Sequence, residues 1–239
     1  MLDRFTDSSG PPVSAMFREA LDAEDRGDKE EAERCYRAAA ALGDVMSTVN
    51  LGVLLAGGTE MQKEEAASLF RTAAENGNDS GMRNMGYANA VGIGVPKNKE
   101  EGVRWYRMAA EKGNVKAQCN LAVMLRHGNG TPVDHKEALR WYRLSAEAGY
   151  FRAQATLAAM YMNGEGTERD VNEAFRWYTE AAENGSSRAM HRLALMYMNG
   201  EGTSKDEKKA AELLRTAADR GYSKAIRLLS DIQTSSEDR

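Results

Sequence analysis

A 36-residue period is the feature that most restricts the fold of this chain. Short Ala-rich strings end in glycine six times, at intervals of 34 residues once and 36 residues four times. These glycines are Gly43, Gly77, Gly113, Gly149, Gly185 and Gly221. The three tryptophans recur at the same interval, and a tyrosine follows each of them. Such a period indicates stacked small units, because one unit alone cannot bury its apolar face.

Each unit is predicted to hold two antiparallel helices. In residues 150–185, apolar residues at helical spacing predict a first helix over about 151–162 and a second over about 171–184. Gly185 follows the second helix, where a positive φ costs glycine least. Good helix formers dominate the composition, and only four prolines occur. The predicted fold class is all-α: a right-handed α–α superhelical solenoid of stacked antiparallel helix pairs.

The period divides the chain into nine segments. A flexible N-terminal tail is expected over residues 1–10, and an atypical helix pair over 11–43. Five repeats follow at 44–77, 78–113, 114–149, 150–185 and 186–221. A capping helix is expected over 222–233, with Ile226 and Leu229 facing inward, and a flexible tail over 234–239.

The turn inside each later unit contains Gly-x-Gly, which begins at Gly92, Gly128, Gly164 and Gly200. A phosphate-binding loop would need a preceding strand and a longer glycine fingerprint, which this chain lacks. Four copies in phase with the repeat therefore favour a structural turn. The end units differ, since leucine replaces tryptophan at Leu69 and Leu213. Atypical end units are expected in repeat arrays.

The repeat resembles the Sel-1-like repeat, a relative of the tetratricopeptide repeat. Its best copy contains Ala153, Leu157, Tyr161, Gly164, Gly166, Glu173, Ala174, Trp177, Tyr178, Ala181, Ala182, Glu183 and Gly185. The five units cover about three quarters of the chain, and the atypical helix pair at 11–43 resembles a tetratricopeptide pair. The resemblance implies a protein-binding scaffold in which the first helix of each unit lines a concave groove.

Charge and hydropathy restrict the partners. The net charge is −4, from 32 basic and 36 acidic residues mixed along the chain, so we expect no nucleic-acid partner. No run is long and apolar enough for a membrane span or a signal peptide. We therefore expect a cytoplasmic protein without membrane contact, although non-classical secretion as an effector stays open. The sequence indicates no oligomeric state.

Candidate catalytic and metal-binding residues are few. His127, Asp134 and His135 could be drawn as metal ligands, but no further ligand clusters with them. Cys35 and Cys119 lie in units too far apart to pair. Some cysteine-rich members of the resembled family are described as β-lactamases, and they carry a cysteine pair in each repeat that this chain lacks. We expect no enzyme activity, no catalytic residue, no metal and no cofactor; a β-lactamase-type hydrolase is the alternative.

The candidate binding residues lie on the first helices, away from the apolar stripe. One column of repeat positions contains amides that suit a peptide backbone, and neighbouring columns contain cations that suit carboxylates. The predicted peptide-binding residues are Asn50, Asn84, Asn120, Arg83, Lys116, Arg152, Arg188 and Arg192. Met162 and Met198, just before the turns, offer an alternative soft surface.

The predicted function is a non-catalytic scaffold or adaptor. Its partner is expected to be another protein that presents an extended or helical segment, acidic or C-terminal in character. An effector or signalling regulator that uses the same surface is a further alternative. The sequence leaves the identity of the partner open.

Overall fold

The computed structural model describes residues 15–237 and contains thirteen helices, with no strand, in that range. The helices are α1 (Ala15–Asp25), α2 (Lys29–Ala41), α3 (Val45–Leu55), α4 (Glu60–Glu75), α5 (Asp79–Val91), α6 (Lys99–Glu111), α7 (Val115–His127), α8 (His135–Glu147), α9 (Phe151–Asn163), α10 (Val171–Glu183), α11 (Ser187–Asn199), α12 (Glu207–Asp219) and α13 (Ser223–Glu237). The predicted all-α repeat fold is confirmed. The predicted N-terminal tail, residues 1–10, lies outside the described residues, as do residues 238–239.

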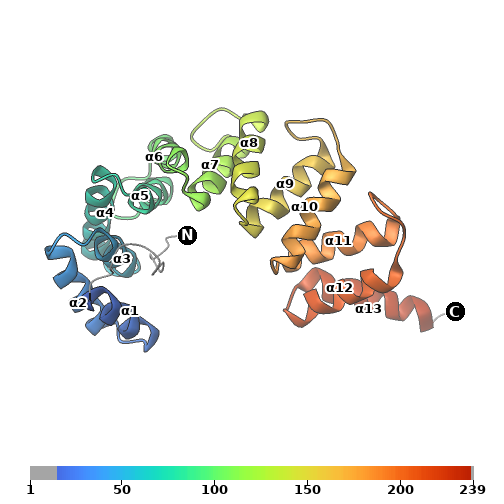
Figure 1. The fold of residues 1–239 in the computed structure, drawn as a ribbon, viewed down its shortest axis with the longest axis horizontal. Coiled ribbons are helices and arrows are strands. Elements are labelled where there is room, and N and C mark those ends of the chain that lie inside the picture. The colour runs from blue at the N-terminus through green and yellow to red at the C-terminus, as the bar shows by residue number, and fades with distance from the viewer. Residues whose placement is uncertain (1–14, 238–239) are drawn as a thin grey trace. The chain divides into compact units, whose positions relative to one another are not determined.

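The chain forms two compact units, Met1–Pro132 and Val133–Arg239. In the first unit each of the helices α1 to α7 packs against the next, and in the second unit α8 to α13 do the same (Figure 1). Odd-numbered helices are the first helix of each pair, and even-numbered helices are the second. The pair in repeat 4 deviates from its predicted bounds by one residue at each C-terminal end.

Capping residues explain where the helices begin and end. Asp134 caps α8 by accepting a hydrogen bond of 2.8 Å from the backbone N–H of Glu137, and Asn98 caps α6 in the same way at 3.0 Å. Second helices are followed by a glycine in the left-handed region, such as Gly185 at φ +90°. The glycines that recur in the sequence therefore mark the ends of helices in the structure.

The second glycine of the Gly-x-Gly turn has a different role. A β-carbon on Gly166 would lie 2.2 Å from the carbonyl oxygen of His135, at the start of the preceding second helix. A β-carbon on Gly94 would meet the carbonyl oxygen of Lys63 in the same way. The turn thus rests directly on backbone of the previous pair, and only glycine leaves room for this contact.

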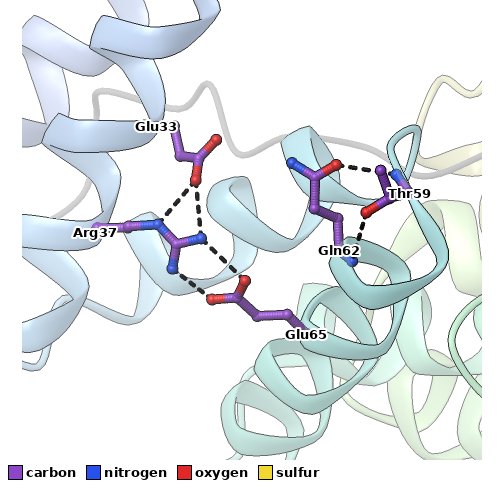
Figure 2. A network of polar contacts seen from close by, with 5 residues as sticks. All are labelled: Glu33, Arg37, Thr59, Gln62 and Glu65. Carbon is purple, nitrogen blue, oxygen red and sulfur yellow. Dashed lines mark hydrogen bonds and ion pairs between the residues drawn. The ribbon is translucent and has the colours of Figure 1, made fainter.

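The first repeat has no second turn glycine and uses a capping box instead. The hydroxyl of Thr59 accepts a hydrogen bond from the backbone N–H of Gln62, whose side chain accepts one from the backbone N–H of Thr59 (Figure 2). Beside it, the guanidinium of Arg37 on α2 bridges Glu33 on its own helix and Glu65 on α4. The bond from Arg37 lowers the pKa of the Glu65 carboxyl. This ion-pair network joins successive second helices.

The core consists of the repeated Ala, Leu and Tyr positions, with Tyr36 and Tyr142 at most 1% exposed. The tryptophan slot is less uniform than the sequence suggested. Trp177 is 5% exposed, whereas Trp141 is half-buried. The indole N–H of each donates a 3.1 Å hydrogen bond to a glutamate one turn earlier.

The C-terminal helix corrects two predictions. Residues 234–237, expected in a flexible tail, continue α13, because no glycine or proline interrupts them. Ile226, expected to face inward, is 50% exposed. It takes the repeat position of Gln154 and Met190, which are buried, but no helix follows α13 in the described part of the chain to cover it. Leu229 is half-buried.

Candidate functional site

The open surface of the first helices is the candidate site. We use the name first-helix face for four repeat positions, the second, sixth, ninth and thirteenth residues of α5, α7, α9, α11 and α13, which share one helical stripe. In α9 they are Arg152, Thr156, Ala159 and Asn163, and in α11 Arg188, Arg192, Leu195 and Asn199. All eight are exposed or half-buried.

The structure divides the predicted binding residues into two groups. Lys116, Arg152, Arg188 and Arg192 are exposed, and Asn120 is half-buried, so these five lie on open surface. Asn50, Asn84 and Arg83 are 1%, 0% and 3% exposed and lie in the interior instead of an open groove. Side-chain hydrogen bonding explains their burial.

Two asparagines at the sixth position of a first helix form hydrogen bonds with tyrosines of the preceding helix pair. The amide of Asn50 donates a 3.2 Å hydrogen bond to the hydroxyl of Tyr36, which donates a 2.7 Å bond to Glu24. Asn120 bonds Tyr106, again fourteen residues earlier. Burial raises the pKa of Tyr106, while Arg83 and Asn120 oppose that rise. A buried tyrosine hydroxyl needs a hydrogen-bond partner, and these amides supply one.

Asn84 lies at the same repeat position but has no tyrosine to bind. The residue fourteen positions earlier is Phe70, which is fully buried and has no hydroxyl to satisfy. The carbonyl of Asn84 instead accepts a 2.5 Å hydrogen bond from the guanidinium of Arg83. These hydrogen-bonding roles were not predicted from the sequence, although the fourteen-residue Tyr–Asn spacing is visible in it.

Each unit contains a small cavity on the first-helix face. In the first unit, a cavity of about 260 Å³ lies between α5 and α7 over α6. Its lining includes Tyr87, Val91, Tyr106, Asn120, Val123 and Met124. In the second unit, a cavity of about 230 Å³ lies between α9 and α11 over α10. Its lining includes Ala159, Asn163, Tyr178, Arg192, Leu195 and Met196.

The two cavities are the same feature in two repeats. Each of the six residues named for one has its counterpart in the other, 72 residues away, or two repeat lengths. Apolar groups and a tyrosine ring line both, and amides lie at the edge. Their volumes fall below the roughly 300–1,000 Å³ of small-molecule sites, which suits a single side chain of a partner better than a cofactor. Met162, one of the two methionines singled out above, also lines the second cavity.

Two larger cavities lie elsewhere in the second unit. One of about 380 Å³ lies between α10 and α12 beside Leu213, at the slot that tryptophan fills in the preceding repeat. The other, about 390 Å³, lies beside Met198, Leu214 and Ile232, at α13. Beside the first of these cavities, the smaller Leu213 side chain accounts for the empty space.

The candidate metal ligands and the two cysteines have other environments in the structure. No three His, Cys, Asp or Glu side chains in that part of the chain could hold a metal ion. Asp134, one of the candidate ligands, caps α8. Cys35 and Cys119 are buried free thiols, and burial raises the pKa of Cys35, which keeps it in the less reactive thiol form. In the part of the chain that the structure describes, no helix is long and apolar enough to cross a membrane.

Comparison with known proteins decides the family. The family described as Sel1 repeat matches residues 21–44, 46–78, 79–114, 115–150, 152–186 and 187–222. The chain belongs to the Sel1 repeat family. Proteins of this family are generally protein-interaction scaffolds and typically non-catalytic. A search of curated proteins found no match.

Solved Sel1 repeat structures share the fold. A Sel1 repeat protein from Oxalobacter formigenes is 29% identical, with a TM-score of 0.81 over 90% of this chain and 89% of that one. The protective antigen c5321 of uropathogenic Escherichia coli is 33% identical, with a TM-score of 0.77 over 88% of this chain. This chain spans 46% of the antigen's length. The immunity protein Pa5087 of Pseudomonas aeruginosa, 18% identical with a TM-score of 0.59 over 89% of this chain and 84% of its own, shares the fold alone.

Proposed function

We propose that this Sel1 repeat protein is a non-catalytic scaffold whose first-helix face binds a peptide segment of a partner protein. The observation that carries the proposal is the pair of equivalent cavities, one in each unit, on the same face of the repeat. A cavity of this size on an open helix face suits one apolar side chain of a bound segment.

The contact residues proposed are those of the predicted set that lie on open surface. Asn120 and Arg192 line the cavities, and Lys116, Arg152 and Arg188 lie one helical turn nearer the helix N-termini. Asn50, Asn84 and Arg83 take a supporting part, because their side chains are buried. An amide or guanidinium beside an apolar cavity suits a peptide, which offers both carbonyl groups and apolar side chains.

A peptide selection tests this function without assuming a sequence. The full chain is immobilised and used to select binders from a library of random dodecamers. Affinities of the enriched peptides are then measured by fluorescence anisotropy for wild type, Val123→Trp and Leu195→Trp, since an indole at either equivalent position fills its cavity. Leu144→Trp, on the exposed side of α8, is the matched control.

The proposal expects at least one cavity substitution to weaken an enriched peptide about tenfold or more, with the control within about twofold of wild type. Circular dichroism confirms that each variant keeps its helix content. Enriched peptides that bind all three variants like wild type, or a selection that enriches nothing, would exclude the first-helix face as a peptide site.

A further inference from the structure

The first-helix face of the second unit carries a cluster of basic residues. Arg152, Arg188 and Lys224 occupy the same repeat position on α9, α11 and α13, and Arg192 follows Arg188 by one helical turn. All four side chains are exposed. In the first unit, the matching repeat position holds Met46, Ser80 and Lys116, so that face carries less positive charge.

These four cations have no acidic partner in the part of the chain that the structure describes. Elsewhere in the same unit, two cations on second helices do have one: Arg176 pairs with Glu173 at 3.2 Å, and Lys209 with Asp206 at 3.7 Å. The positive charge of the first-helix face is therefore left for an outside group, although the whole protein has a net charge of −4.

Two residues of this cluster, Arg192 and Lys224, affect the same buried histidine. His191, on α11, is 8% exposed, and its ring lies 5.6 Å from that of Tyr222. Burial lowers its pKa most, and the charges of Arg192 and Lys224 lower it further. Two cations on different helices thus reach the same neighbourhood, which a single bound anionic segment could span.

The apolar cavity between α9 and α11 lies beside this cluster. Arg192 lines the cavity together with Ala159, Leu195 and Met196, and the acidic Glu201 is also part of the lining. A ligand that meets both features must carry negative charge and an apolar side chain together. A nucleic-acid backbone offers phosphates but no aliphatic side chain for the cavity, and the net negative charge of the protein repels it.

We propose that the second unit binds an acidic peptide segment, whose carboxylates meet Arg152, Arg188, Arg192 and Lys224 while one apolar side chain enters the cavity between α9 and α11. The inference rests on the proposed function and specifies the chemistry of its partner. Charge complementarity determines the choice of the acidic segment over neutral or basic ones.

Defined peptides test the inference with the full chain. A fluorescein-labelled dodecamer of Glu and Gln with one central Leu is compared with three others: Leu replaced by Gly, Glu replaced by Gln, and Glu replaced by Lys. Single-stranded dT12 serves as a polyanion without an apolar side chain. Affinities are measured by anisotropy at about 50 and 300 mM salt, because exposed charge pairs are screened over roughly 8–10 Å at physiological ionic strength.

The acidic Leu peptide is expected to bind best, with each replacement peptide and dT12 weaker by about fivefold or more and with affinity falling at high salt. Arg188→Glu and Arg192→Glu are expected to weaken it about tenfold, while the matched reversal Arg215→Glu on α12, also exposed, leaves affinity within about twofold. Leu195→Trp is expected to abolish the advantage of Leu over Gly.

Absence of binding by the acidic peptide overturns the inference, as does binding that dT12 matches or that Arg215→Glu weakens equally. Failure of the inference and failure of the proposed function give different results. Neutral or basic dodecamers that are enriched in the selection and are weakened by Leu195→Trp would keep the function and refute the acidic specificity. Enriched peptides insensitive to every cavity substitution would refute both.

Discussion

Gly166 sits against the backbone of His135 so closely that an added β-carbon would lie 2.2 Å from its carbonyl oxygen. The turn between α9 and α10 therefore stacks directly on the start of α8. Gly166 also has a φ of +75°. Two separate costs, backbone strain and a steric clash, thus oppose any side chain at this position.

Gly166→Ala is expected to lower the free energy of unfolding by about 2–5 kcal/mol, about 1–2 from the left-handed backbone and about 1–3 from the clash. Gly149→Ala is the matched control, since its φ is +84° with nothing within 4 Å of the added atom. It should cost only the backbone contribution. Urea unfolding followed by circular dichroism measures both, and equal losses would show that the turn is not tightly stacked.

Asn50→Ala is expected to destabilise the protein by about 1–3 kcal/mol, because the buried hydroxyl of Tyr36 loses its donor. A double-mutant cycle with Tyr36→Phe isolates the bond between them. The loss from Asn50→Ala should shrink by about 0.5 kcal/mol or more in the Phe background. Additive effects in thermal unfolding would instead assign the cost to packing alone.

Leu213→Trp is expected to stabilise the second unit by about 0.5–2 kcal/mol. The indole would occupy the cavity of about 380 Å³ between α10 and α12, as Trp177 occupies its slot one repeat earlier. Trp177→Ala is expected to cost about 3–5 kcal/mol, as aromatic truncations in cores do. If denaturant unfolding shows Leu213→Trp to be destabilising, the cavity does not have the shape of the indole slot.

Stability is expected to fall as His191 becomes protonated. Its folded pKa lies below its ordinary value of 6.5, so the unfolded state binds protons more readily. The stabilisation is present in full above pH 6.5 and is lost as the pH falls below that value toward the folded pKa. Thermal unfolding between pH 8 and pH 5 should show a larger loss in wild type than in His191→Phe, which keeps a ring against Tyr222. Parallel curves would mean that other groups dominate the acid response.

The periodic features of the fold were predictable from sequence, whereas the tasks of individual polar residues were not. The glycines and the apolar spacing mark helix ends such as Gly185 because local backbone geometry determines them. The burial of Asn50 and Asn84 depends on which side chain the preceding pair presents, Tyr36 or Phe70. That is a tertiary relationship, which the periodicity of one helix does not contain.

The exposed residues of the candidate site were predictable from the sequence, whereas its cavities were not. The exposed cations Arg152, Arg188 and Arg192 follow from helical spacing, because polar residues off the apolar stripe face solvent. The cavities depend on how far side chains such as Ala159 and Leu195 fill the space between successive first helices. Side-chain volume summed over three helices determines that space, so only the folded structure reveals it.

Hydrogen–deuterium exchange of the full chain, with and without the tightest dodecamer from the peptide selection, tests the proposed scaffold function most directly. Bound peptide is expected to slow backbone exchange over the C-terminal halves of α9 and α11, residues 157–163 and 193–199, which line the cavity of the second unit. The second helices α8 and α12, which contribute no residue to this cavity, should exchange as in the free protein. Slowed exchange confined to those second helices, with α5, α7, α9 and α11 unchanged, would contradict the account.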